Sequence, residues 1–286
     1  MSVAPTKEVV IKPNTSWIHI DVEGLIAYKD LLWLLVRRDF VAKYKQTVLG
    51  PIWFFANPII TTLVFTVVFS GVMKVATDGT PPILFYMSGM LGWNYFSTVL
   101  SGTSNSLAGN THLFAKVYFP RLIPPLATTI SSIFALLIQL VTFFVFYAHY
   151  KWNTDGGATI AQPSILWLGY LGVTLHMAIL ALGIGLILSA MSAKYRDLQQ
   201  VQAYLINLLM YVTPVIYPLS RIPEKYQWIA NINPMTAIVE ATRSIFLGSG
   251  LVSLPQYAAS LLVSFVILGA GIFAYQRSAR TFVDTV

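Results

Sequence analysis

The chain has 286 residues, of which 56% are hydrophobic and only 10% are Asp, Glu, Lys or Arg. An ordinary soluble domain carries about 25% charged residues, so this composition excludes a soluble globular protein. The chain contains no cysteine, which excludes disulfides, Cys-ligated metal and a thiol nucleophile. The net charge is +7. Binding to nucleic acid would need a soluble basic face, and the sequence predicts none.

The first 45 residues precede the first long uncharged stretch. Residues 1–23 are predicted to be a cytoplasmic arm, because charges and prolines stand where a signal peptide needs an apolar core. Residues 24–47 mix Leu, Trp and Tyr with seven charged side chains. No uncharged run within them is long enough to cross a bilayer. We predict an amphipathic interface helix over 24–47 that lies on the cytoplasmic leaflet.

Six later stretches carry no charged residue and are 28, 37, 29, 38, 23 and 33 residues long. They cover residues 46–73, 79–115, 122–150, 156–193, 198–220 and 244–276. A helix needs about 20 mostly apolar residues to cross the bilayer core. The sequence therefore predicts an all-α membrane domain over 51–275 with six transmembrane helices. They are expected at about 51–73, 83–104, 126–148, 165–191, 199–217 and 257–275.

Two connections between these spans have helical signals of their own. Asn110 or Thr111 can cap a short amphipathic helix that Pro120 ends, which predicts a cytoplasmic helix over 110–121. In the outer segment 218–248, Asn233-Pro234 predicts an N-cap followed by a helix that ends at Gly248. That helix is too short to span, so we predict that the segment enters the outer leaflet and returns. Glu240 and Arg243, three residues apart, can form an ion pair there.

The basic residues predict the orientation. With both termini in the cytoplasm, inner segments hold 13 of the 18 Lys and Arg residues and outer segments hold five. The positive-inside rule favours this arrangement, which makes residues 276–286 a cytoplasmic tail. The prediction is a multi-pass membrane protein with both termini in the cytoplasm.

Several kinds of chemistry are missing. No phosphate-binding G-x-x-x-x-G-K-[ST] loop occurs, so this chain is not predicted to hydrolyse ATP by that route. The four histidines are scattered, and no metal site is predicted. No span holds a carboxylate of the kind that ion-coupled carriers use. Gly183 and Gly185 fall within a predicted span, where helix packing is the expected reason. Any active transport would need a partner as its source of energy.

Five strings in order resemble a known family. They are RRDFVAKYKQTVLGPIWFFANP (37–58), AKVYFPRLIPPLA (115–127), SAKYRDLQQ (192–200), TPVIYPLSRIPEKYQWIANINPMTAIVEATR (213–243) and ARTFVDTV (279–286). The chain resembles the permease subunit of type-2 ABC exporters of lipid-linked polysaccharide, which include O-antigen, capsule and teichoic-acid permeases. The resemblance implies a homodimer with two cytoplasmic ATPases that bind ATP and Mg²⁺. It implies no catalytic residue and no cofactor on this chain.

The resemblance also implies roles for particular residues. The segment 110–121 would be the coupling helix, with apolar and basic side chains for a groove on the ATPase. Its coupling residues would be Leu113, Phe114, Lys116, Val117, Phe119 and Arg121. The alternative is an ordinary loop between spans.

The cargo implied by the resemblance is a polysaccharide on undecaprenyl or a similar lipid, joined through phosphate or pyrophosphate. Four basic residues near the first span are candidates to bind the lipid phosphate: Arg37, Arg38, Lys43 and Lys45. The alternative is attraction to anionic phospholipid head groups. Sugar rings stack on aromatic side chains, so ten aromatics are candidates to line a glycan channel: Trp53, Phe54, Phe85, Tyr86, Trp93, Tyr95, Phe96, Tyr204, Tyr211 and Tyr217. Aromatic belts at the membrane interfaces are the alternative for these.

Three other classes of function stay open at this point. An exporter of a small lipid or drug would share the six spans. A membrane-embedded transferase would need catalytic acids or histidines at the interface. Only Asp197 offers itself, and pairing with the nearby Lys194 and Arg196 is the simpler account of it. A passive channel would need no coupling helix. Dependence of ATP turnover on residues 110–121 would separate these classes.

Overall fold

The computed structural model describes residues 21–42, 52–114, 116–153, 161–195 and 197–283, and within these ranges the chain is helical with no strand. The helices are α1 (Val22–Ala27), α2 (Lys29–Ala42), α3 (Trp53–Phe65), the π-helix η2 (Thr66–Val72), α4 (Pro82–Ser104), α5 (Ser106–Gly109), α6 (Thr111–Phe114), α7 (Ile123–Asn153), the 3₁₀-helix η4 (Ile165–Leu168), α8 (Gly169–Lys194), α9 (Leu198–Val212), the 3₁₀-helix η5 (Leu219–Arg221), α10 (Glu224–Ile232), α11 (Pro234–Leu247) and α12 (Leu254–Val283). The predicted all-α fold class is confirmed for the described residues.

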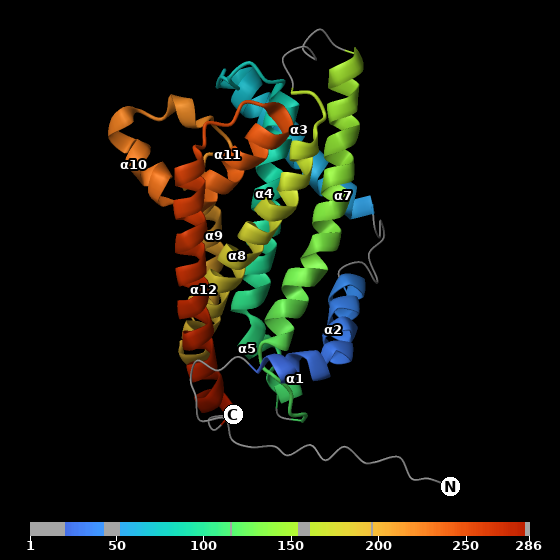
Figure 1. Cartoon of the computed structure of the whole chain (residues 1–286), viewed down its shortest axis with the longest axis vertical. Coiled ribbons are helices and arrows are strands. Elements are labelled where there is room, and N and C mark those ends of the chain that lie inside the picture. The colour runs from blue at the N-terminus through green and yellow to red at the C-terminus, as the bar shows by residue number, and fades with distance from the viewer. Residues whose placement is uncertain (1–20, 43–51, 115, 154–160, 196, 284–286) are drawn as a thin grey trace.

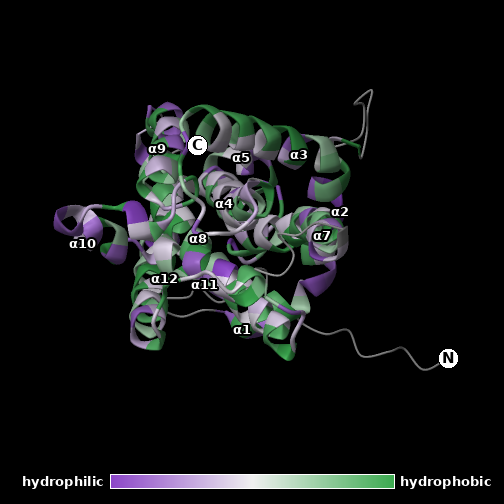
Figure 2. Ribbon diagram, turned by 90° about the horizontal axis from the view of Figure 1, so that it is seen from above, coloured by the Kyte–Doolittle hydropathy of each residue, from purple (hydrophilic) through white to green (hydrophobic). Residues whose placement is uncertain are grey.

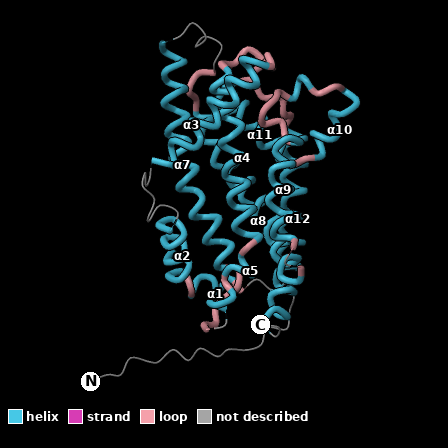
Figure 3. The backbone as a smooth tube through the Cα atoms, turned by 180° about the vertical axis from the view of Figure 1, so that it is seen from behind, coloured by secondary structure: helices cyan, strands magenta, loops and turns pink. Residues whose placement is uncertain are grey.

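The long helices pack side by side into one bundle (Figure 1). The short helices α1 and α5 and the C-terminal end of α12 lie at one end of it, which we call the α5 end (Figures 1 and 3). The helices α10 and α11 lie toward the opposite end, which we call the α11 end. The first described helix and the last therefore reach the same end of the bundle, as an even number of membrane crossings between them requires.

Helix α4 lies in the middle of the bundle, with α3, α7, α8, α9 and α11 around it (Figure 2). Pro82 begins the helix, and its fixed φ suits the first helical position. Leu84, Tyr86, Val99 and Leu100 are fully buried, so the core follows α4 along its whole length. Helix α3 crosses α4 and α7 obliquely on one side (Figures 1 and 2).

Glycines allow helix α8 to approach its neighbours closely. A Cβ atom on Gly183 would lie 2.8 Å from the backbone of Leu268 in α12. A Cβ atom on Gly185 would lie 2.7 Å from Cβ of Thr103 in α4. Small residues at such contacts let helix backbones meet and gain van der Waals contact in a membrane. The predicted packing role of Gly183 and Gly185 is confirmed.

Four helical stretches of the described residues are long and apolar enough to cross a membrane: Phe55–Val72, Ile123–Trp152, Ile165–Lys194 and Leu254–Ala279. Helix α4 carries no charged residue, but its many Gly, Ser and Thr residues make it less apolar. Helix α9 has only 15 residues. The structure thus supports a multi-pass membrane protein, and the count of six spans stays a prediction.

The segment 24–47 differs from the single interface helix that the sequence predicts. The helix is divided at Tyr28 into α1 and α2, and residues 43–51 lie outside the described part of the chain. Helix α2 packs along α7, where the rings of Phe40 and Phe134 have centroids 5.2 Å apart. Leu35 and Val36 are buried in this contact. Tertiary packing against α7 therefore covers part of the apolar face that an interface helix would bury in the lipid leaflet.

The helix after Asn233 matches the sequence prediction at both ends. Asn233 is the N-cap, and its Oδ1 accepts a hydrogen bond of 3.0 Å from the backbone N–H of Met235. The helix ends at Leu247, and Gly248 has a left-handed backbone with φ of 74°. Glycine adopts that conformation without steric cost.

Candidate functional site

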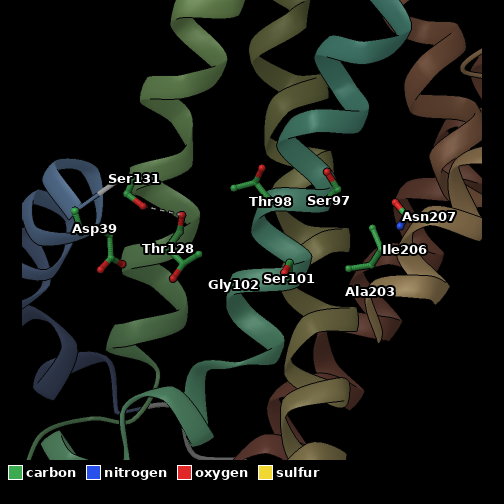
Figure 4. A pocket seen from close by; sticks show the side chains of 11 residues that line it. Asp39, Ser97, Thr98, Ser101, Gly102, Thr128, Ser131, Ala203, Ile206 and Asn207 are labelled. Atoms are coloured by element: carbon green, nitrogen blue, oxygen red, sulfur yellow. Dashed lines mark hydrogen bonds between the residues drawn. The ribbon is translucent and has the colours of Figure 1, made fainter. Parts of the chain in front are cut away.

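A groove lined by polar side chains runs between α2, α4, α7 and α9 toward the α5 end of the bundle. It consists of two adjoining cavities of about 670 Å³ and 470 Å³, which share Asp39, Ser101, Gly102 and Thr128. We call it the polar groove, and its lining is Arg38, Asp39, Ala42, Ser97, Thr98, Ser101, Gly102, Asn105, Gly109, Asn110, Thr128, Ser131, Gln199, Gln202, Ala203, Ile206 and Asn207. In Figure 4, α4 places its hydroxyl groups between Thr128 and Ser131 of α7 on one side and Asn207 of α9 on the other.

Close contact between two helices forms one wall of the groove. A Cβ atom on Gly102 of α4 would lie 2.4 Å from Cγ2 of Thr128 on α7. The missing side chain therefore lets α4 and α7 meet where the two cavities join. On α9, Gln199, Gln202 and Ile206 share one helical face, which places both amides on the groove side.

Six polar side chains of the groove make no hydrogen bond to any described residue. They are Ser101, Asn105, Thr128, Gln199, Gln202 and Asn207. Hydroxyl groups elsewhere in the bundle are mixed: those of Thr103 and Thr236 also lack a partner among the described residues, whereas several others bond within their own helix. Ser88, Thr142 and Thr174, for example, each donate to a carbonyl of their own helix at 2.8–3.0 Å.

These polar groups are accessible from the groove. Ser101, Asn105 and Asn207 are exposed, and Thr128 and Gln199 are half-buried. Gln202 is only 7% exposed, and its amide makes no hydrogen bond to another described residue. Amide and hydroxyl groups both donate and accept hydrogen bonds. The polar groove therefore has the chemistry to hold water or a polyhydroxylated ligand.

Five of the aromatic side chains proposed for a glycan channel are instead part of the protein core. Phe85, Tyr86, Trp93, Tyr95 and Phe96 are at most 4% exposed. They pack in the main cluster around α4, and none of them lines the polar groove. The structure gives no support to a channel role for these five, because a buried ring cannot stack on a sugar.

The other aromatic candidates lie nearer the surface. Tyr204 and Tyr211 of α9 are 72% and 63% exposed, and Trp53 of α3 is 40% exposed. Tyr217 is half-buried and donates a hydrogen bond of 2.9 Å to the carbonyl of Tyr211. The side chain of Phe54 lies outside the described part of the structure. A channel role for the exposed tyrosines stays a prediction.

Two of the four basic residues proposed to bind the lipid phosphate are described. Arg37 and Arg38 of α2 are both exposed, whereas Lys43 and Lys45 lie outside the described residues. Arg38 lines the polar groove and donates from Nε and Nη2 to Oδ1 of Asp39, at 2.9 Å and 2.8 Å. A phosphate contact for these residues stays a prediction.

The predicted coupling segment is less helical than expected. Helix α6 covers only Thr111–Phe114, and residues 117–120 have no helical structure. Pro120 was expected to end the helix, yet the regular hydrogen bonding stops earlier. Lys116 and Val117 are exposed at the α5 end.

The remaining coupling candidates pack inward. Phe119 is 5% exposed and joins the cluster of Leu35, Val36 and Ile123. Leu113 and Phe114 are half-buried against that cluster, and the guanidinium of Arg121 lies 5.7 Å from the ring centroid of Phe114. The segment is therefore a packed loop whose tip, Lys116 to Tyr118, faces outward.

The predicted ion pair between Glu240 and Arg243 lies in the core near the α11 end. Arg243 Nη1 donates to Glu240 Oε1 at 2.9 Å, and the two side chains are 3% and 1% exposed. Arg243 also donates from Nη2 to the carbonyl of Val215 at 2.9 Å and stacks over the ring of Phe85, 3.8 Å from its centroid. Burial lowers the pKa of Arg243, and the charge of Glu240 opposes that shift.

This ion pair joins four parts of the chain. Val215 follows α9, Phe85 belongs to α4, and Glu240 Oε2 accepts a hydrogen bond of 2.9 Å from the backbone N–H of Leu251 after α11. We call Arg243, Glu240 and their partners the α11 clamp. It holds the C-terminal end of α9 against α4 and α11. The groove side of α9 carries the amides of Gln199 and Gln202.

Sequence reasoning predicted the ion pair but missed the polar groove. The available signal was the placement of hydroxyl and amide residues within uncharged stretches. Ser97, Thr98 and Ser101 recur at helical spacing, as do Gln199, Gln202 and Ile206. Five of the aromatic rings proposed as sugar contacts are buried in the core instead.

A charge-poor helical bundle with an unpaired polar groove is typical of a membrane transport protein. The profile of the ABC-2 type transporter family matches residues 30–247. The chain belongs to the ABC-2 type transporter family.

Curated relatives agree with the family assignment. The chain is 28% identical over 268 residues to an O-antigen export system permease protein, RfbA, of Myxococcus xanthus, covering 93% of this chain and 98% of the relative. It is 25% identical over 256 residues to an RfbA of Klebsiella pneumoniae, covering 89% and 94%. It is also 24% identical over 221 residues to the polysialic acid transport protein KpsM of Escherichia coli, covering 77% and 82%.

Proposed function

We propose that this chain is the permease subunit of an ATP-driven exporter that moves a lipid-linked polysaccharide such as O-antigen across the bacterial inner membrane. The observation that carries this proposal is the similarity to O-antigen export permeases along 93% of the chain. The polar groove supports it independently, because its amides and hydroxyls suit the hydroxyl groups of a sugar polymer. Polysialic acid is the second candidate cargo, favoured by the similarity to the polysialic acid transport protein KpsM.

The energy comes from partner chains in this proposal. Two copies of the permease associate with two cytoplasmic ATPases, which bind ATP and Mg²⁺. The α5 end faces the cytoplasm, and the exposed tip at Lys116 and Val117 contacts the ATPase. The excess of basic residues on the predicted inner segments supports this orientation. The chain itself then contributes no catalytic residue.

Transport follows from a shift between two conformations of the bundle. ATP binding moves the ATPases, and the motion reaches the α5 end through the loop 116–120. Helix α9 has only two buried side chains, Gln202 and Ile206, while the α11 clamp fixes its other end. Movement of its loosely packed end widens the polar groove, and the glycan advances past the unpaired amides. Arg37 and Arg38 gather the lipid phosphate at the entrance.

A reconstitution experiment tests the proposal. The permease and its ATPase are placed in vesicles, and arrival of a labelled lipid-linked glycan on the far side is followed with and without ATP. We expect ATP-dependent transport that falls in Val117→Asp, because a carboxylate at the exposed tip disrupts the ATPase contact. The matched control is Val22→Asp, the same change at a valine of α1 that is as exposed as Val117, at 55%, and lies outside the loop. Transport without ATP would contradict the proposal and indicate a passive channel.

A further inference from the structure

The polar groove carries almost no charge. Arg38 and Asp39 are the only ionisable residues among those that line it. They form an ion pair with each other, with Arg38 Nη2 2.8 Å from Asp39 Oδ1. The groove therefore has no net charge among the described residues, although the whole chain carries +7.

The other described basic residues do not line the groove. Arg243 is buried and is held by Glu240, the carbonyl of Val215 and the ring of Phe85. Lys74, Lys151 and Lys225 lie in other parts of the fold, at or beyond the helix ends. No row of cations follows the groove along the described helices.

A polymer with a carboxylate on each repeat needs such cations. Pores that pass anions are lined by Arg or Lys, which replace the lost hydration of the charge. An ionised group that leaves water without a partner meets a penalty of several kcal/mol. Arg38 cannot serve as this cation without leaving Asp39, which already holds it in an ion pair.

The neutral side chains of the groove fit a different ligand. Asn105, Gln199, Gln202 and Asn207 offer amides, while Ser101 and Thr128 offer hydroxyls, and none of the six is engaged within the described chain. Each group both donates and accepts hydrogen bonds, as each sugar hydroxyl does. Such a surface binds uncharged sugars in many registers.

We infer that the polar groove takes a glycan whose repeating units are uncharged, and that it discriminates against a polymer with a carboxylate on each unit. The inference rests on the proposed function and names the substrate class of that site. It separates the two candidate cargoes, since a polysialic-acid-like capsule polymer is a polyanion and a neutral hexose polymer is not.

Two polymers on one lipid carrier test the inference. The full permease with its ATPase, in vesicles of neutral phospholipid, receives a neutral hexose polymer or a sialic acid polymer of equal length. We expect the neutral polymer to move at least about tenfold faster, because a carboxylate that leaves water without a cation partner loses more than the 1.4 kcal/mol that tenfold represents. Equal or faster transport of the acidic polymer would overturn the inference and leave the proposed function standing. ATP-dependent movement of neither polymer would overturn the proposed function, and the inference with it.

Charge variants sharpen the test. Gln202→Lys adds a cation to the groove, and Asp39→Asn removes its anion, so each should reduce the preference for the neutral polymer. The control Asp30→Asn makes the same change on the exposed part of α2, outside the groove, and should leave the preference unchanged. An unchanged preference in both groove variants would also overturn the inference, provided that each variant still transports the neutral polymer.

Discussion

The α11 clamp and the polar groove are two polar regions of one bundle. Their side chains differ in whether they make hydrogen bonds within the chain. In the clamp, Arg243 and Glu240 are at most 3% exposed and each makes hydrogen bonds that tie loops to helices. In the groove, amides such as Gln202 and Asn207 make none within the described chain. A membrane offers no partner for either set. Hydrogen bonds within the chain therefore hold the clamp together, whereas the side chains of the groove stay available to a ligand.

Breaking the α11 clamp is expected to cause the largest loss of folding stability. Arg243→Leu leaves the Glu240 carboxylate buried without its cation, which should lower the free energy of unfolding by about 3–5 kcal/mol. Thermal unfolding of the purified permease in detergent measures this. The matched control is Arg221→Leu at an exposed arginine, which should stay within about 0.5 kcal/mol of the wild type.

A double variant shows how much of the lost stability comes from leaving the Glu240 charge buried without a partner. Replacing both residues, Glu240→Leu with Arg243→Leu, removes the uncompensated charge and should recover part of the stability lost in the single variant. If Arg243→Leu unfolds at the temperature of the wild type, the clamp does not hold the α11 end together.

A smaller loss of stability is expected from a substitution where α4 approaches the α11 clamp. A Cβ atom on Gly89 would lie 2.8 Å from the carbonyl of Val215 and 3.3 Å from Nη2 of Arg243. Gly89→Ala should therefore destabilise the protein by about 1–3 kcal/mol through overpacking. On α8, a Cβ atom at Gly172 meets nothing within 4 Å. Gly172→Ala should be neutral or stabilising by up to about 1 kcal/mol in the same unfolding assay.

The contrast between these two alanine variants tests the geometry of the clamp rather than helix propensity. Both replace a glycine within a long helix, and only one brings a new methyl group against Val215. Equal stability of the two variants would contradict the close approach of α4 to the end of α9.

The groove should show the reverse pattern, with little effect on folding and a clear effect on transport. Gln202→Leu removes an amide that has no described partner, so stability should be unchanged or slightly raised. Transport of the glycan should fall about two- to tenfold, the equivalent of one hydrogen bond of 0.5–1.5 kcal/mol. Vesicle transport and thermal unfolding are measured on the same preparation.

Gln200→Leu is the matched control for the groove, because Gln200 lies on the exposed side of α9. It should change neither transport nor stability. A Gln202→Leu variant that unfolds earlier and transports normally would assign Gln202 to the core and remove it from the groove.

Local rules predicted the features that depend on neighbouring residues. Asn233 and Gly248 bound α11 because capping chemistry is set within a few positions, and the Glu240–Arg243 pair follows from one helical turn. Helices also form over most of the uncharged stretches. The sequence was sufficient wherever the partner of a residue lies close by in the chain.

Tertiary contacts between distant parts of the chain determined the features that the sequence did not predict. Phe85 and Trp93 have the chemistry to stack on sugars, yet packing around the central α4 buries them. The packing of α2 on α7 depends on residues about a hundred positions away, such as Phe134 against Phe40. The polar groove combines Asp39, Ser101, Thr128 and Asn207 from four helices, and no single stretch of sequence contains it.

The most direct test of the central claim, that the polar groove is the path of the glycan, uses the absence of cysteine in this chain. Single cysteines replace Asn207, which lines the groove, or Leu208, which is 60% exposed on another face of α9. The account predicts that Asn207→Cys reacts with a membrane-impermeant maleimide and is protected when lipid-linked glycan is loaded, whereas Leu208→Cys, facing lipid, reacts little in either state. Equal labelling of Asn207→Cys with and without glycan would contradict the account.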